Sequence, residues 1–292
     1  MTDENTLAKS LGIPLAELRA VAETGNAAYR YERRLIGKKI RLLRPPRERL
    51  MKIQRAIKTR LLDSMPLPPY VHGWRKRRSP KTYAKVHIAQ AAVINADIQD
   101  FFPTVPAGRV YGFWLRAGYQ EKAAKLLTAL TTCDNQLPQG APTSQSIGNH
   151  VLLPLHRRLR LLARIHGLRY GAYGDEIAIS GRKRTRRLKG LALRIIEQEG
   201  FRANPKKTEV MLRNARQKLT GIVVNRKPSI GRPQYRELRA IVHNCLVRGP
   251  TGQNRTDHPN FKMYLRGKIA HLEQVIPRLG NRLLAEFERI IW

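Results

Sequence analysis

Acidic residues are scarce in this sequence of 292 residues. It holds 21 Asp and Glu against 56 Lys and Arg, which gives a formal net charge of +35 and a pI near 11.2. So large an imbalance makes a folded chain repel itself unless a polyanion neutralises it. The composition therefore predicts a nucleic acid partner. Because Asp and Glu are rare in this chain, the position of each one is informative about function.

Cysteines are few, and long apolar runs are missing. Cys133 and Cys245 stand far apart, with no CxxC pair or Cys/His cluster, which argues against a disulfide framework and against a zinc site. No run of about 18 uncharged apolar residues occurs, and no basic segment followed by an apolar one opens the chain. Positive charge is spread over the whole length, so no separate amphipathic anchor stands out. We therefore expect a cytoplasmic protein that makes no membrane contact.

The hydrophobic pattern predicts an α+β protein. Hydrophobic residues make up 42% of the chain, enough for a core, and we find no internal repeat or low-complexity segment. Helical periodicity is expected over 6–24 with a break at residues 12–14, and over 47–62, 80–87, 106–117, 120–131, 144–165, 185–199 and most of the chain after 234. Strands are expected over 91–98, 168–180, 208–212 and 219–224, with a small basic hairpin over 29–43.

Two acids stand where strands are expected to end. Residues 91–98 are apolar and β-branched, the pattern of a buried strand, and Asp97 lies near its end. Asp175 lies in a tight turn between two further strands. Either Asp alone is most simply a cap or a turn former. Side by side on one antiparallel sheet, two carboxylates would suit the pair of hard cations that phosphoryl transfer to a hydroxyl requires.

Four segments in a fixed order narrow the interpretation. They are 95–103 (NADIQDFFP), 137–144 (LPQGAPTS), 172–176 (AYGDE) and 200–208 (GFRANPKKT). In that order they resemble the leading catalytic motif, the LPQG-x-P-x-S motif, the Tyr-x-Asp-Asp turn and the next palm motif of reverse transcriptases. The resemblance covers about residues 70 to 225 and implies a right-hand polymerase fold. The regions it implies are an N-terminal extension with fingers (1–90), a palm of antiparallel sheet plus helices with inserted fingers helices (91–228), and a helical thumb (229–292).

Two further elements resemble those of retron enzymes. That branch carries an Asn-Ala-x-x-His element before the first catalytic motif and a Val-Thr-Gly element after the palm. This sequence has YAKVH at 83–87 and LTG at 219–221 in those places, each with one substitution. The resemblance implies that His87, Thr220 and Gly221 contact a structured RNA. Without it, a histidine on a helix would be assigned to packing or to a surface hydrogen bond.

The resemblance also assigns the metal ligands. Asp97, Asp175, Glu176 and the backbone carbonyl of Ile98 are expected to hold two Mg²⁺ ions, for which Mn²⁺ can substitute, and Glu176 is the auxiliary catalytic carboxylate among them. Glu176 is the main departure from the family pattern, because the usual residue is Asp. One extra methylene displaces the carboxylate by roughly a carbon–carbon bond, and metal geometry is sensitive to such a shift. We expect slower chemistry rather than none.

Five residues are expected at the incoming nucleotide. Phe102 matches the bulky residue that excludes a ribose 2′ hydroxyl, although it also suits a core aromatic. Arg75 and Arg78 have the guanidinium fork that fits triphosphate oxygens. Gln139 is expected to position the template base or to cap its own loop. Lys206 is expected to bind phosphate or to protonate the leaving pyrophosphate.

The implied function is that of a retron RNA-directed DNA polymerase. Such an enzyme uses deoxynucleoside triphosphates to copy a dedicated noncoding RNA into RNA-linked single-stranded DNA (msDNA), starting from a guanosine 2′ hydroxyl. It acts in antiphage defence beside a separate effector protein. Two alternatives stay open, a non-retron bacterial reverse transcriptase and a catalytically weak nucleic-acid-binding scaffold derived from a polymerase. Glu176 is the best reason for the second.

Overall fold

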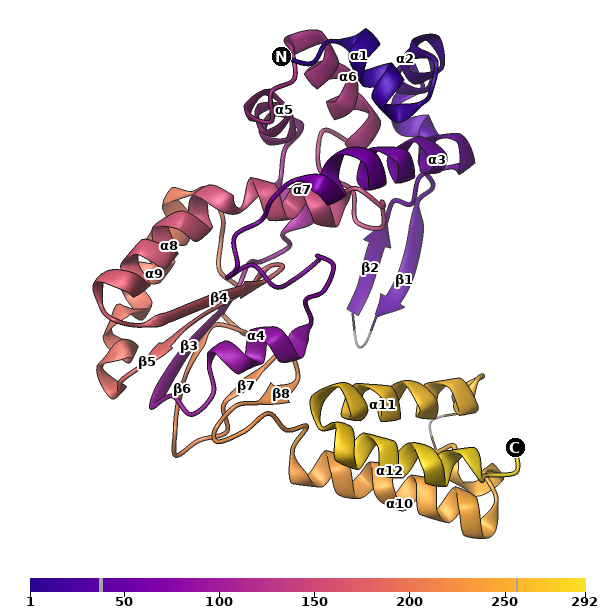
Figure 1. Cartoon of the computed structure of the whole chain (residues 1–292), viewed down its shortest axis with the longest axis vertical. Helices are drawn as coiled ribbons and strands as arrows, with labels where there is room; N and C mark the ends of the chain where they lie inside the picture. The colour runs from indigo at the N-terminus through magenta and orange to yellow at the C-terminus, as the bar shows by residue number, and fades with distance from the viewer. Residues whose placement is uncertain (37–38, 256) are drawn as a thin grey trace.

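A four-stranded antiparallel sheet forms the centre of the protein (Figure 1). The computed structural model describes residues 1–36, 39–255 and 257–292. The strand order is β4-β5-β3-β6, from β3 (Ala92–Asp97), β4 (Arg169–Tyr173), β5 (Glu176–Gly181) and β6 (Glu209–Leu212). These bounds confirm the predicted α+β class and the strand that was expected over 91–98.

Both faces of this sheet are covered, which explains why its strands read as nearly continuous apolar runs. Ile94 and Ile177 point to one face and join the larger core, which includes residues of helices α8 (Leu153–Ile165) and α9 (Lys189–Gln198). Val93 and Ala178 point to the other face. That face packs against α4 (Pro80–Val86) and the short hairpin β7 (Lys218–Leu219) and β8 (Ile222–Val223) (Figure 1).

The N-terminal helices and the helices within residues 107–151, which follow β3, form a second layer above the sheet (Figure 1). A basic hairpin, β1 (Glu32–Ile36) and β2 (Lys39–Leu43), extends from this layer, as predicted. Residues 37 and 38 between its strands lie outside the described residues. The helices of this layer are α1 (Glu4–Leu11), α2 (Leu15–Glu23), α3 (Glu48–Ala56), α5 (Ala107–Arg116), α6 (Glu121–Thr131) and α7 (Ser144–Val151).

One predicted helix is divided in two. The segment 144–165 forms α7 and α8, with Leu152 between them. Pro154 has no backbone N–H and its ring crowds the preceding turn, so a continuous helix is interrupted at this point. The helix that was expected from residue 185 begins instead at Lys189, after a 3₁₀ turn over Lys183–Leu188.

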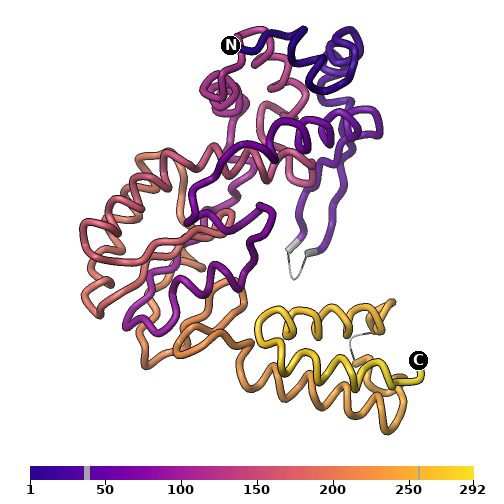
Figure 2. The backbone as a smooth tube through the Cα atoms, viewed as in Figure 1, coloured from indigo at the N-terminus to yellow at the C-terminus, as the bar shows by residue number. Residues whose placement is uncertain are grey.

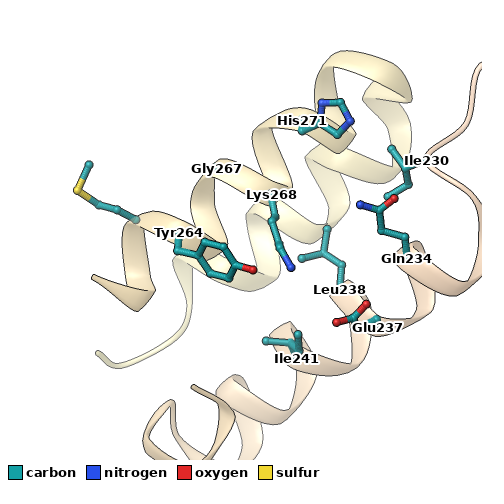
Figure 3. A pocket seen from close by; sticks show the side chains of 10 residues that line it. Ile230, Gln234, Glu237, Leu238, Ile241, Tyr264, Gly267, Lys268 and His271 are labelled. Atoms are coloured by element: carbon teal, nitrogen blue, oxygen red, sulfur yellow. The ribbon is translucent and has the colours of Figure 1, made fainter. Parts of the chain in front are cut away.

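A three-helix bundle ends the chain. It consists of α10 (Arg232–Arg248), α11 (Phe261–Val275) and α12 (Pro277–Glu288), and the hairpin β1–β2 runs toward it from the other side of the molecule (Figure 2). A cavity of about 410 Å³ lies between α10 and α11, where Leu238 and Ile241 face Tyr264 and Lys268 (Figure 3). No described helix is long and apolar enough to cross a membrane.

Candidate active site

Strand pairing brings the acidic motifs together. In the β3–β5 ladder Asp97 stands opposite Glu176, and the backbone N–H of Ile98 donates to the carbonyl of Asp175 at 3.0 Å. On the other side, the N–H of Asn204 donates to the carbonyl of Asp97 at 2.7 Å. Backbone hydrogen bonds therefore fix both Asp97 and Asp175 relative to the central strand.

The turn that carries Asp175 is packed tightly against the segment 71–74. Gly174 has a φ of +62°, and a side chain there would collide with the ring of Trp74. A Cβ on Gly73 would overlap the backbone of Gly174. Neither overlap involves a flexible side-chain end, so both positions require glycine. The predicted turn is thus confirmed as a tight one, supported by residues about a hundred positions earlier in the sequence.

Asp97 and Asp175 line one cavity of about 340 Å³. Its walls come from β2 and the residues after it, from the end of β3, from the loop before α7, and from the loop before β6. The lining residues are Ile40, Arg41, Leu42, Arg44, Asp97, Ile98, Asp100, Phe101, Phe102, Pro103, Gln136, Gln139, Asp175, Asn204 and Lys207. Phe102, Gln139 and Ile98 therefore line the same cavity as the two acids.

The ammonium group of Lys207 contacts the carboxylate of Asp97. Its Nζ lies 2.9 Å from Oδ1 and 2.9 Å from Oδ2 of that carboxylate, so an ammonium faces both oxygens. The side chain of Asp97 is 13% exposed and that of Lys207 is 52% exposed. Lys206, which we had expected at the phosphates, does not line the cavity, and its N–H donates to Asn204 Oδ1. Two adjacent lysines give no sequence signal that would have told them apart.

The two acids of the turn have different surroundings. Burial and the charge of Asp97 raise the pKa of Asp175. Burial raises the pKa of Glu176 to about 7, although the backbone N–H of Thr220 donates to its Oε1 at 3.1 Å and opposes the rise. Glu176 does not line the cavity. Within the described parts of the chain, no three Asp, Glu, His or Cys side chains form a group that could hold a metal ion.

The expected triphosphate-binding arginines lie away from the cavity. Arg75 Nη1 donates to the carbonyls of Leu67, Pro68 and Val71 at 3.0–3.3 Å, which employs the guanidinium in holding its own loop. Arg78 lines a different hollow, beside Tyr70 and Arg160.

Two other arginines line the cavity in their place. Arg41 on β2 is one, and its charge acts on Asp175. Arg44 is the other, and it forms an ion pair of 2.8 Å with Asp134. The basic pattern of the hairpin was visible in the sequence, but not its approach to the acids.

The residues that were expected to contact RNA differ in accessibility. His87 is fully buried, and its Nδ1 lies 2.7 Å from Ser180 Oγ. Burial lowers the pKa of His87 to about 3, so the ring is neutral, and it offers RNA no surface in this conformation. Thr220 and Gly221 form the half-buried turn between β7 and β8, with φ values of +45° and +87°.

Known proteins with similar sequences are polymerases. A family model described as reverse transcriptase (RNA-dependent DNA polymerase) matches residues 36–224. The Retron Mx65 reverse transcriptase of Myxococcus xanthus is 32% identical over 305 residues, which covers 96% of this chain and 70% of that protein. The Retron Ec86 reverse transcriptase of Escherichia coli is 30% identical over 252 residues, covering 84% of this chain and 79% of that protein. This chain therefore belongs to the reverse transcriptase family, among the retron reverse transcriptases, and is an RNA-directed DNA polymerase.

Proposed function

We propose that this protein copies a structured noncoding RNA into RNA-linked single-stranded DNA. The observation that carries the proposal is the cavity in which Asp97 and Asp175 lie together with Phe102, Gln139 and Lys207. Acids, a bulky aromatic, an amide and a cation from distant segments meet there, as polymerisation of deoxynucleotides on a template requires. The similarity to retron enzymes supports a dedicated RNA as template and a guanosine 2′ hydroxyl as the starting point.

The regions are proposed to act as a right hand. Residues 1–90 supply the fingers, including hairpin β1–β2, residues 91–228 the palm with its sheet, and residues 229–292 a thumb built from the terminal bundle. The hairpin and the terminal bundle both lie beside the sheet and extend toward each other, and this arrangement supports the division (Figure 2). The charge of +35 supports binding of a polyanion along these surfaces.

Reverse transcriptases use divalent metal ions, and we assign their site to Asp97, Asp175 and the carbonyl of Ile98. Mg²⁺ is the preferred ion for these hard oxygen donors, and Mn²⁺ is a substitute. The fit is supported by Asp97, whose two oxygens already hold a cation, the Lys207 ammonium. Bound there, divalent ions activate the attacking hydroxyl and neutralise charge on the leaving pyrophosphate.

The other cavity residues are assigned to the nucleotide. Lys207 has a flexible stem and is placed to hold or protonate a phosphate once it leaves Asp97. Arg41 and Arg44 offer guanidinium groups to the triphosphate from the hairpin side. Phe102, whose ring centroid lies 5.3 Å from that of Trp74, is held on the wall where it would exclude a 2′ hydroxyl. Gln139, which lines the same cavity, is assigned to the template base.

We assign the biological role to antiphage defence in the cytoplasm, with a separate effector protein. The support is the similarity to retron reverse transcriptases.

The test is to purify the protein from cells that carry its native locus and to extract the bound nucleic acid. Wild-type protein should yield an RNA joined to single-stranded DNA, sensitive to RNase and DNase in turn. Asp97→Asn and Asp175→Asn variants should yield RNA alone. RNA alone from every sample, wild type included, would refute the proposal.

A further inference from the structure

Glu176 follows Asp175 directly, yet its carboxylate belongs to different surroundings. It is absent from the walls of the cavity that Asp97 and Asp175 line. In the part of the chain that the structure describes, Glu176 does not complete a group of three potential metal ligands with the two aspartates, although their charges act on it. The carboxylate oxygen Oε1 instead accepts a hydrogen bond of 3.1 Å from the backbone N–H of Thr220.

Thr220 has a backbone conformation that needs support. It is a β-branched residue with a φ of +45°, followed by Gly221 with a φ of +87°. A two-residue hairpin turn with both φ values positive suits Asn-Gly or Gly-Gly, and a β-branched side chain is strained there. The strands on either side are only two residues long, Lys218–Leu219 and Ile222–Val223, so the ladder alone gives little restraint. Strain of this kind persists where neighbouring groups fix the backbone, and Glu176 supplies such a group.

Tyr83 is a second residue that acts on Glu176. Its ring is fully buried, with ring centroids 5.9 Å from that of Tyr173 and 5.4 Å from that of His87. Burial first, and then the negative charge of Glu176, raise the pKa of Tyr83. The Tyr83 hydroxyl makes no hydrogen bond of good geometry with any described residue, and the charge of the Glu176 carboxylate acts on it. Helix α4, strand β5 and the β7–β8 turn thus meet at Glu176.

We propose that Glu176 is a positioning residue rather than a metal ligand, and that its carboxylate ties the turn carrying Asp175 to the Thr220-Gly221 turn. The metal pair is then held by Asp97 and Asp175. The length of glutamate is essential to this role, because a side chain shorter by one methylene falls short of the Thr220 N–H. The inference rests on the proposed polymerase function only in that Asp97 and Asp175 are taken to bind the catalytic metal ions.

Three substitutions separate this role from metal binding. Glu176→Gln keeps the length and an oxygen acceptor for Thr220 but removes the negative charge. Glu176→Asp keeps the charge but shortens the side chain. Asp175→Asn is the matched control for the loss of a metal ligand in the same turn. Each full-length variant is measured by thermal unfolding without metal and by electron paramagnetic resonance of Mn²⁺ bound with a chain-terminated primer–template and a deoxynucleoside triphosphate. Primer extension then gives kcat, KM and the Mg²⁺ concentration for half-maximal rate.

Glu176→Gln is expected to keep kcat within about threefold of wild type, since a neutral amide oxygen still accepts the hydrogen bond. Its Mn²⁺ stoichiometry, Mg²⁺ requirement and melting temperature should stay at the wild-type values. Glu176→Asp is expected to melt at a lower temperature and to lose about tenfold in kcat with unchanged Mn²⁺ stoichiometry, because the turn is no longer held. Asp175→Asn should lose Mn²⁺ at an unchanged melting temperature.

The opposite pattern would overturn the proposal. If Glu176 is a ligand, Glu176→Gln loses about a hundredfold in kcat, binds less Mn²⁺ and needs more Mg²⁺, while Glu176→Asp works as well as wild type or better. Failure of the proposed function has another signature, namely extension that Asp97→Asn leaves intact. In that case the melting temperatures of the Gln and Asp variants still decide whether Glu176 holds the turn.

Discussion

Replacing Lys207 by methionine is expected to change metal affinity and turnover in opposite directions. Lys207 Nζ lies 2.9 Å from both oxygens of Asp97, so a divalent ion that binds this carboxylate has to displace the ammonium. The lysine side chain is 52% exposed, and an ion pair that accessible contributes about 0.5–1 kcal/mol. Removing the competitor should lower the Kd of Mn²⁺ for the nucleotide-free protein by about two- to fivefold.

Turnover should fall in the same variant. The displaced lysine is placed to hold or protonate a phosphate, and loss of one such charged contact costs on the order of 10- to 100-fold in kcat. Mn²⁺ titration followed by electron paramagnetic resonance gives the first quantity, and single-nucleotide primer extension gives the second. Lys206→Met is the control, because Lys206 is adjacent in sequence but absent from the cavity. If Lys207→Met binds Mn²⁺ no tighter than wild type, or if Lys206→Met has the larger effect on kcat, the assignment of Lys207 is wrong.

Three further predictions concern the cavity wall and the core. Phe102→Ala should admit ribonucleotides, which a ratio of kcat/KM for ribo- and deoxynucleotides measures; an unchanged ratio would assign Phe102 to packing alone. Arg41→Ala should raise KM for deoxynucleotides by about tenfold, whereas Arg75→Ala should lower the melting temperature and leave KM nearly unchanged, since Arg41 lines the cavity and Arg75 does not. Burial lowers the pKa values of His87 and His156 to about 3, below the ordinary 6.5, so their contribution to stability is complete above pH 6.5 and is lost as the pH falls. Between pH 7 and pH 5 each should cost about 2 kcal/mol of unfolding free energy, and His156→Phe should reduce that pH dependence in urea titrations; an identical slope would contradict the reasoning.

Local pattern was enough to predict most of the elements. Ser79 and Pro80 predict the start of α4. The structure has a capping box there, in which the side chain of Ser79 accepts a hydrogen bond from the N–H of Thr82. The apolar run over 91–98 predicts β3. Both faces of that strand are buried, so its sequence is largely apolar and does not alternate regularly with polar residues. The division of 144–165 at Leu152 was missed because apolar periodicity continued through Pro154 and outweighed it.

The candidate site was predictable only where position in the sequence fixes position in space. Asp97 ends β3, and Asp175 lies in the turn directly before β5, the strand that pairs with β3, so their proximity follows from the ladder. Arg41 reaches the cavity through the placement of a hairpin that has no sequence link to the acids. The choice between Lys206 and Lys207 depends on which way an irregular loop presents each side chain. Tertiary contacts decide both cases, and periodicity carries no information about them.

Rigid support of the turn that carries Asp175 is what the proposed metal site requires, because only two aspartate side chains, Asp97 and Asp175, are assigned to it. Metal ligands have to be held within about half an ångström of their working positions, which demands a backbone that does not yield. Gly73 lies directly against Gly174, so the turn has no room to move toward the segment before α4. The bond from Ile98 N–H to the Asp175 carbonyl fixes it to the central strand, and the proposed role of Glu176 fixes it to the hairpin that precedes the C-terminal bundle. An acid held from three sides loses little entropy when its ligand binds, and the surrounding positive charge offsets the cost of keeping it ionised.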